Sequence, residues 1–193
     1  MTRVVMVPGL RGDAPDHWQQ RLTEPLGALH LPTGRTPLDL DGRVADLAAA
    51  LEGDGEPVVL VAHSAGVLTL LHWAAGAPAA ATARVEHALL VTPPTLSAEL
   101  PPVYPRLAEL CAAGWLPVPG SPLPFASTVV ASDDDDLGPR DEVTALAQGW
   151  GADLVRAGAV GHANPASGHG DWPLVERLVR DLVGCGRVNS RTA

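Results

Sequence analysis

A serine stands between two apolar segments in the pattern Ala62-His63-Ser64-Ala65-Gly66. The preceding residues, 58–61, are Val and Leu only and predict a buried strand, and residues 67–71 have the composition of a buried helix. A sharp strand-to-helix turn exposes its central side chain and needs small residues two positions before and after it. Ala62 and Gly66 meet this requirement, so the pattern predicts Ser64 as a nucleophile. The alternative is a serine that only caps the helix.

Two backbone N–H groups near this turn could stabilise a negatively charged oxygen. The predicted helix begins beside Ser64, which makes the N–H of Ala65 one candidate donor. The first apolar run ends in Pro8-Gly9-Leu10-Arg11-Gly12, and a glycine-containing loop there could supply a second donor from Leu10. The alternative for this loop is a plain turn. His63 is expected to be structural, because its side chain should leave the turn in a different direction from that of Ser64.

A serine nucleophile needs a base, and the base needs an orienting acid, in the chain order serine, acid, histidine. Downstream of Ser64, the strand-like residues 128–131 lead into the run Asp133 to Asp136. A solvated acidic loop is the alternative for most of that run. The segment Gly161-His162-Ala163-Asn164 carries the candidate base His162. His169 competes with it but lies farther from the last predicted strand.

Short apolar runs alternate with helical patterns along the whole chain. Strands are predicted at 4–7, 29–31, 58–62, 85–91, 128–131 and 153–155, and helices at 15–26, 40–51, 65–75, 103–113, 142–149 and 174–183. This alternation predicts an α/β fold with a six-stranded, mainly parallel sheet and helices on both faces. Parallel strands end at one edge, so Ser64, the aspartate run and His162 should meet there.

Length and composition fit one domain. The chain has 193 residues, of which 46% are hydrophobic, and we expect a single domain over 1–193 with its core at about 3–184 and a short tail at 185–193. No apolar run reaches the length of a membrane span, and no signal peptide is recognisable, so a cytoplasmic location is expected.

Charge and cysteine usage exclude several function classes. The net charge is −9, there is no Lys, and the arginines do not cluster, which argues against nucleic-acid and membrane partners. Cys111 and Cys185 lack metal-type spacing and are expected to remain reduced. Neither a metal nor a cofactor is expected, and the oligomeric state stays open.

Taken together, these motifs resemble a known family of small α/β-hydrolase-fold serine hydrolases, which includes retinoblastoma-binding protein nine and the bacterial YdeN-type enzymes. The resemblance covers residues 3–183, and its most specific part is the segment 161–173 with Ser167-Gly168-His169-Gly170-Asp171-Trp172-Pro173. It implies Ser64 as nucleophile and His162 as base. The family's acid is the second acidic residue of a Ser-x-Asp/Asn-Asp-Pro pattern, which corresponds to Asp135. Asp136 replaces the usual Pro, so Asp134 remains an alternative acid.

The resemblance also implies a compact hydrolase without a large cap domain, in which the Pro-rich segment 93–124 forms one wall of the site. The implied activity is that of a carboxylesterase-like serine hydrolase, which cleaves carboxylester or thioester bonds of a small acyl substrate through an acyl-enzyme. Two alternatives are a hydrolase-fold binding protein with an idle triad and an acyltransferase or thioesterase that uses the same residues.

Overall fold

The computed structural model describes residues 2–12, 14–53 and 55–189. Its strands are β1 (Arg3–Val7), β2 (Leu29–His30), β3 (Val58–His63), β4 (Val85–Val91), β5 (Ser127–Ala131) and β6 (Asp153–Arg156). Its helices are α1 (Trp18–Leu26), α2 (Leu40–Ala50), α3 (Ala65–Gly76), α4 (Ala79–Thr82), α5 (Leu107–Ala112), α6 (Arg140–Trp150), the 3-10 turn η1 (Pro165–Ser167) and α7 (Pro173–Asn189). The strands form one parallel sheet in the order β2-β1-β3-β4-β5-β6, which confirms the predicted fold class.

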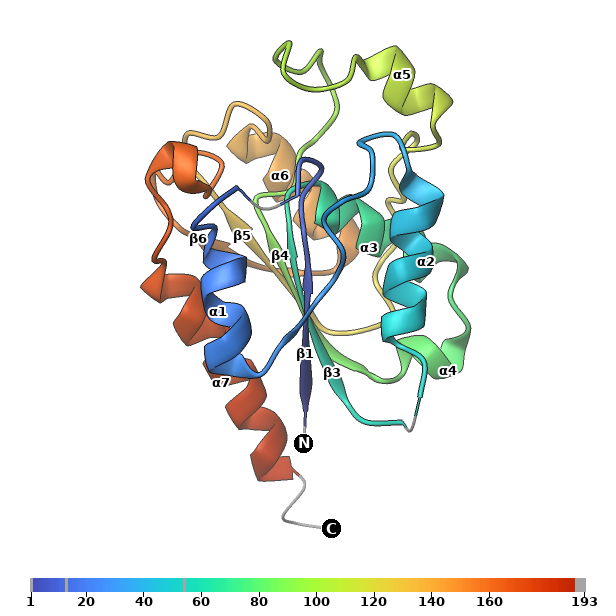
Figure 1. The fold of residues 1–193 in the computed structure, drawn as a ribbon, viewed down its shortest axis with the longest axis vertical. Coiled ribbons are helices and arrows are strands. Elements are labelled where there is room, and N and C mark those ends of the chain that lie inside the picture. The colour runs from blue at the N-terminus through green and yellow to red at the C-terminus, as the bar shows by residue number, and fades with distance from the viewer. Residues whose placement is uncertain (1, 13, 54, 190–193) are drawn as a thin grey trace.

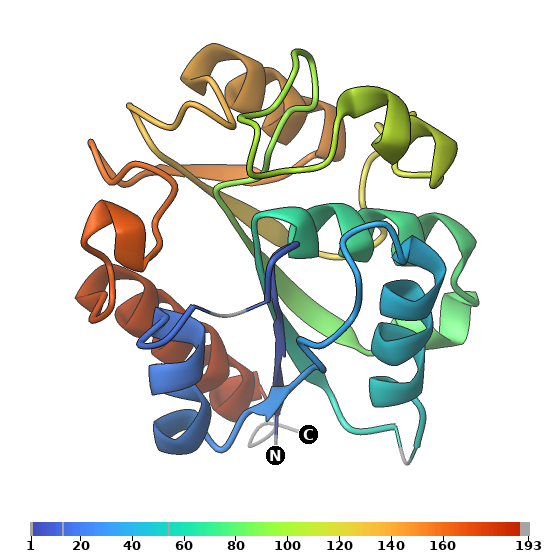
Figure 2. The same cartoon turned by 45° about the horizontal axis from the view of Figure 1, so that its top comes forward.

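Successive side chains along the strands point to opposite faces of the sheet and pack in two separate hydrophobic clusters. Val5, Leu60 and Leu90 face the cluster that α2, α3 and α6 complete, whereas Met6 and Val61 face the one completed by α1 and α7. Figure 1 shows α1 and α7 on one side of the sheet and α2, α3 and α4 on the other, and Figure 2 shows the same layers with the top of the molecule turned toward the viewer. Burial on both faces explains why the central strands are continuously apolar in sequence.

Several predicted boundaries are wrong. The helix predicted at 15–26 begins only at Trp18, where His17 is the N-cap residue, and Pro25 lies inside its last turn. The helix predicted at 103–113 is confined to α5, because Pro105 disfavours helical geometry in the residue before it. Neither α4 nor η1 was predicted. The helix predicted at 174–183 is α7, which begins at Pro173 and whose backbone continues to Asn189.

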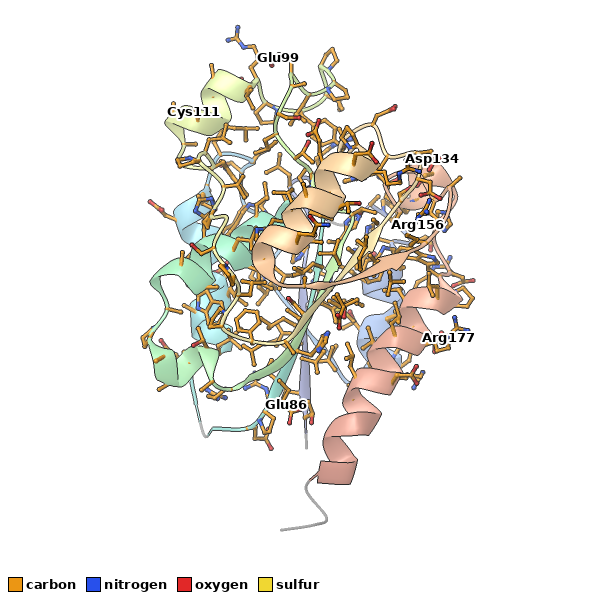
Figure 3. The ribbon with its side chains drawn as sticks, turned by 180° about the vertical axis from the view of Figure 1, so that it is seen from behind. Glu86, Glu99, Cys111, Asp134, Arg156 and Arg177 are labelled. Carbon is orange, nitrogen blue, oxygen red and sulfur yellow. The ribbon has the colours of Figure 1, made fainter. Side chains whose placement is uncertain are left out.

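The carboxyl edge of the sheet is the side at which its parallel strands end, and the amino edge is the side at which they begin. The long connection between β4 and β5 covers the carboxyl edge. This connection includes α5 and rises above the ends of the strands (Figure 1). In Figure 3, Glu99 of this connection and Asp134 lie toward the end of the molecule opposite Glu86, which is near the start of β4. Cys111 on α5 is a free, exposed thiol, and the side chain of Cys185 lies outside the described part of the structure. Among the described residues, no helix is long and apolar enough to cross a membrane.

Candidate active site

Ser64 lies at the turn from β3 to α3 in a backbone conformation that L-residues rarely adopt, with φ 56° and ψ −128°. The turn is tight because α3 approaches β1 closely: a Cβ on Gly66 would lie 2.2 Å from the carbonyl oxygen of Val7. The Ser64 side chain makes no helix-capping hydrogen bond, so the N-cap interpretation does not describe it. Its hydroxyl is instead free to face the loops at the carboxyl edge.

The imidazole of His162 joins Ser64 to an aspartate. Its Nε2 lies 2.7 Å from Oγ of Ser64, and its Nδ1 lies 2.7 Å from Oδ2 of Asp135. The Asp135 side chain is 2% exposed, and its other oxygen accepts the N–H of Leu137 at 2.9 Å. A buried carboxylate on Nδ1 keeps the proton on that nitrogen and leaves Nε2 to accept the hydroxyl proton of Ser64.

The four consecutive aspartates have four different environments. Asp133 forms an ion pair with Arg156 at 2.6 Å, and Asp136 is exposed. Asp134, the alternative acid, accepts the N–H of Gly161 at 2.7 Å, and this hydrogen bond is the main reason that its pKa is lowered. The structure therefore brings Asp135 to His162, and it turns Asp134 toward the backbone of the loop that carries His162.

His63 contacts the loop that carries His162. Its Nε2 donates to the carbonyl oxygen of His162 at 2.9 Å, and its ring lies 4.7 Å from that of His17 and 5.2 Å from that of His162. Burial, followed by the neighbouring rings of His162 and His17, holds the pKa of His63 well below its ordinary value. A neutral His63 with its proton on Nε2 fits a structural role. His169 instead lies against Trp172, with ring centroids 5.5 Å apart.

The loop after β1 approaches Ser64 from the other side. A Cβ on Gly9 would lie 3.2 Å from Cβ of Ser64. The buried guanidinium of Arg43 on α2 donates to the carbonyls of Gly9 at 3.2 Å and Leu10 at 2.8 Å, and so holds the loop in place. Arg43 is a residue of the site that was not predicted from the sequence. The available signal was a charged residue on the face of helix 40–51 that also carries Leu40 and Leu47.

Two cavities meet at Ser64. One, of about 400 Å³, is lined by residues of the β1–α1 loop and of the loop after β6, including Arg11, His17, His162 and Asn164. The other has a volume of only about 20 Å³ and is lined by the apolar residues Leu68, Leu96, Leu110, Trp115 and Leu137. Leu10, Ser64 and Tyr104 border both cavities. Among the described residues, no group of three or more His, Cys, Asp or Glu could hold a metal ion.

A family model described as serine hydrolase matches residues 4–181. The chain belongs to this serine hydrolase family. Similar solved structures include a YdeN-like hydrolase from Pectobacterium atrosepticum, with 24% identity, 94% of this chain and 90% of that chain covered and a TM-score of 0.76. The ydeN gene product of B. subtilis has 23% identity, coverage of 95% and 100%, and a TM-score of 0.70.

Est1E from Butyrivibrio proteoclasticus, solved with ferulic acid bound, has 14% identity, covers 95% and 90% of the two chains, and reaches a TM-score of 0.66. No curated protein matches the chain significantly. The family match and these neighbours confirm the resemblance to small α/β-hydrolase-fold serine hydrolases. This serine hydrolase keeps the fold of the YdeN-like proteins over nearly its whole length.

Proposed function

We propose that this serine hydrolase cleaves the ester bond of a small acyl substrate with Ser64 as nucleophile, His162 as base and Asp135 as orienting acid. The observation that carries the proposal is the pair of 2.7 Å contacts through His162, which begin at a strained Ser64 that borders both cavities. Carboxylesters and thioesters can both react with such a serine.

The reaction has two steps, acylation of Ser64 and hydrolysis of the acyl-enzyme. Ser64 Oγ forms a bond to the acyl carbon as His162 Nε2 takes its proton, and the same proton passes to the leaving oxygen or sulfur when the bond to it breaks. Water then attacks the acyl-enzyme, gives its proton to His162 and forms the new carbon–oxygen bond. The acid leaves, and Ser64 regains its proton.

The negatively charged oxygen of each tetrahedral intermediate would accept hydrogen bonds from the N–H groups of Leu10 and Ala65. Ala65 is the first residue of α3, where a backbone N–H has no acceptor within the helix. A trans peptide directs its C=O and N–H to opposite sides, so holding the Gly9 carbonyl toward Arg43 directs the Leu10 N–H away from Arg43. Arg43 thus supports this assignment as a positioning residue.

A pre-steady-state measurement with p-nitrophenyl acetate tests the proposal. We expect a burst of p-nitrophenol close to one equivalent of enzyme, and intact mass spectrometry should detect one acetyl group on the protein. The Ser64→Ala variant should give neither the burst nor the adduct. A folded parent protein without burst, turnover or adduct would support the idle, hydrolase-fold binding protein instead.

A further inference from the structure

The proposed reaction assigns the two cavities at Ser64 to different parts of the substrate. His162 must deliver a proton to the leaving group, and His162 lines the large cavity but not the small one. Ala65, a proposed donor to the oxyanion, lines the small cavity but not the large one. The leaving group therefore belongs in the large cavity, which we call the Arg11 cleft, and the acyl group belongs in the small one, the apolar crevice.

The apolar crevice limits the length of the acyl group. Its volume of about 20 Å³ compares with the roughly 10–15 Å³ that a single water molecule requires. Trp115 and Leu110 in its wall are only 1% and 2% exposed, so a longer chain would have to displace well-packed side chains. An acyl group of about two or three carbons fits this space.

The Arg11 cleft is larger, and among the described residues that line it Arg11 carries a positive charge. Arg11 is exposed and lies 5.9 Å from the centre of the Tyr104 ring, which borders both cavities. Within the described residues, no carboxylate forms an ion pair with Arg11, and none lines the cleft. In a chain of net charge −9, this arginine at the mouth of the site favours an anion.

We propose, on the basis of the function proposed above, that the substrate joins a short apolar acyl group of two or three carbons to a larger leaving group that carries a carboxylate or phosphate. Arg11 is then a specificity-determining residue, since a guanidinium presents several donors to the oxygens of either anion. The crevice sets acyl length, and the cleft sets the charge of the departing alcohol or thiol.

Two matched substrate series test the proposal. One compares 4-acetoxybenzoate with its neutral methyl ester, and each kcat/KM is divided by the rate of uncatalysed hydroxide hydrolysis of the same ester, because the two phenols differ in acidity as well as in charge. The other extends the acyl group of a p-nitrophenyl ester from acetyl to octanoyl. At low ionic strength we expect kcat/KM to be at least about fivefold higher for the anionic acetate, and this ratio should fall as salt is added. Along the acyl series, kcat/KM should fall beyond propionyl.

Two variants test whether Arg11 sets the preference for a charged leaving group and whether Leu110 limits the acyl length. In Arg11→Gln the anionic-to-neutral ratio should approach one, whereas Arg177→Gln, on the exposed face of α7, should keep the parent ratio. In Leu110→Ala the preferred acyl chain should lengthen by several carbons. Leu146→Ala, a partly buried position on α6 outside the crevice, serves as the control for lost packing.

The outcomes separate this inference from the function on which it rests. Ser64-dependent turnover of the esters with equal rates for charged and neutral leaving groups, or with a ratio that Arg11→Gln does not change, would overturn the assignment of the cleft. Equal rates from acetyl to octanoyl would overturn the assignment of the crevice. Failure of every ester to acylate Ser64 would instead remove the proposed function itself.

Discussion

The two edges of the sheet differ in which residue types adopt a positive φ. At the amino edge, the described turns with positive φ use glycine: Gly27, Gly53, Gly55 and Gly151. At the carboxyl edge, non-glycine residues also adopt positive φ. They are Asp16, Ser64, Thr92, Leu96 and Ala163. Such conformations cost about 1–3 kcal/mol each and persist only where the surrounding structure imposes them.

The contacts of polar side chains also differ between the two edges. At the carboxyl edge, Asp135, His63 and Arg43 are buried, and their hydrogen bonds orient the loops around Ser64. At the amino edge, Arg84 also donates to backbone carbonyls, those of Leu51 and Glu56, but it ties two connections together far from the site. Similar contacts therefore serve stability at one edge and the geometry of the site at the other.

The largest expected effect separates neighbouring aspartates at the carboxyl edge. Asp135→Asn keeps the shape of the side chain but removes the charge that holds the His162 tautomer. We expect kcat to fall by about 10⁴-fold, because the imidazole loses the charge that fixes its tautomer and stabilises its protonated form. Steady-state hydrolysis of a p-nitrophenyl ester measures the loss. Asp136→Asn, on an exposed side chain, and Asp133→Asn should change kcat little, and equal losses at all three positions would refute the register of the triad.

The next comparison uses the two ends of α3. Gly66→Ala at the carboxyl edge would place a Cβ 2.2 Å from the Val7 carbonyl, so β1 or α3 must shift. We expect a loss of at least about 3 kcal/mol in the free energy of unfolding. Gly76→Ala at the other end meets no atom within 4 Å and should stabilise the protein by about 0.4–1 kcal/mol. Urea unfolding measures both, and similar values for the two variants would contradict the close approach.

Arg43 and Arg84, which both donate to backbone carbonyls, provide a matched pair. Arg43→Met should lower kcat by about tenfold to a hundredfold with KM little changed, because the Leu10 N–H would lose its fixed direction. Affinity for a trifluoromethyl ketone, which forms a tetrahedral adduct with serine, should fall in parallel, and Arg43→Lys should recover part of both. Arg84→Met should lower stability but keep kcat near the parent value. If the two variants lose only stability, Arg43 does not position the oxyanion donor.

The smallest effect concerns His63 and pH. In the folded state its pKa lies below the ordinary value of 6.5, which the unfolded chain recovers. Between these two pKa values only the unfolded chain binds the proton, so this stabilising contribution is complete above about pH 6.5 and is lost as the pH falls. We expect the free energy of unfolding to decrease by up to about 1.4 kcal/mol per pH unit from this group. Urea titrations from pH 7.5 to 5 should show a shallower decrease for His63→Gln, which does not titrate.

Much of the fold could be predicted because the central strands are unambiguous. Residues 85–91 were predicted with the observed bounds of β4, and the predictions for β1, β3 and β5 differ from the observed strands by one residue at one end. Continuous Val and Leu runs in a short segment fit a doubly buried parallel strand. Short helices such as α4 were missed, because four residues give no periodicity and tertiary packing decides whether they form.

Part of the site could also be predicted from the sequence, and part of it depends on tertiary contacts. The chain order and the elbow pattern predict Ser64 and His162, but the residues alone do not choose among four adjacent aspartates, since that choice depends on how the loop after β5 folds. That loop is fixed by the contacts of Asp134 with Ser132 and with Gly161, and the second contact joins residues 27 positions apart in sequence. Arg43 was missed for the same reason: the two acceptors in the loop beside Ser64, the carbonyls of Gly9 and Leu10, lie more than thirty residues away.

Covalent labelling with a fluorophosphonate tests the central claim most directly. We expect one adduct on the parent protein, located on Ser64 by peptide mass spectrometry. Labelling should be absent in Ser64→Ala and much slower in His162→Ala, while His169→Ala should label at a rate close to that of the parent. Labelling of Ser64→Ala equal to the parent, or an adduct on another serine, would contradict the account.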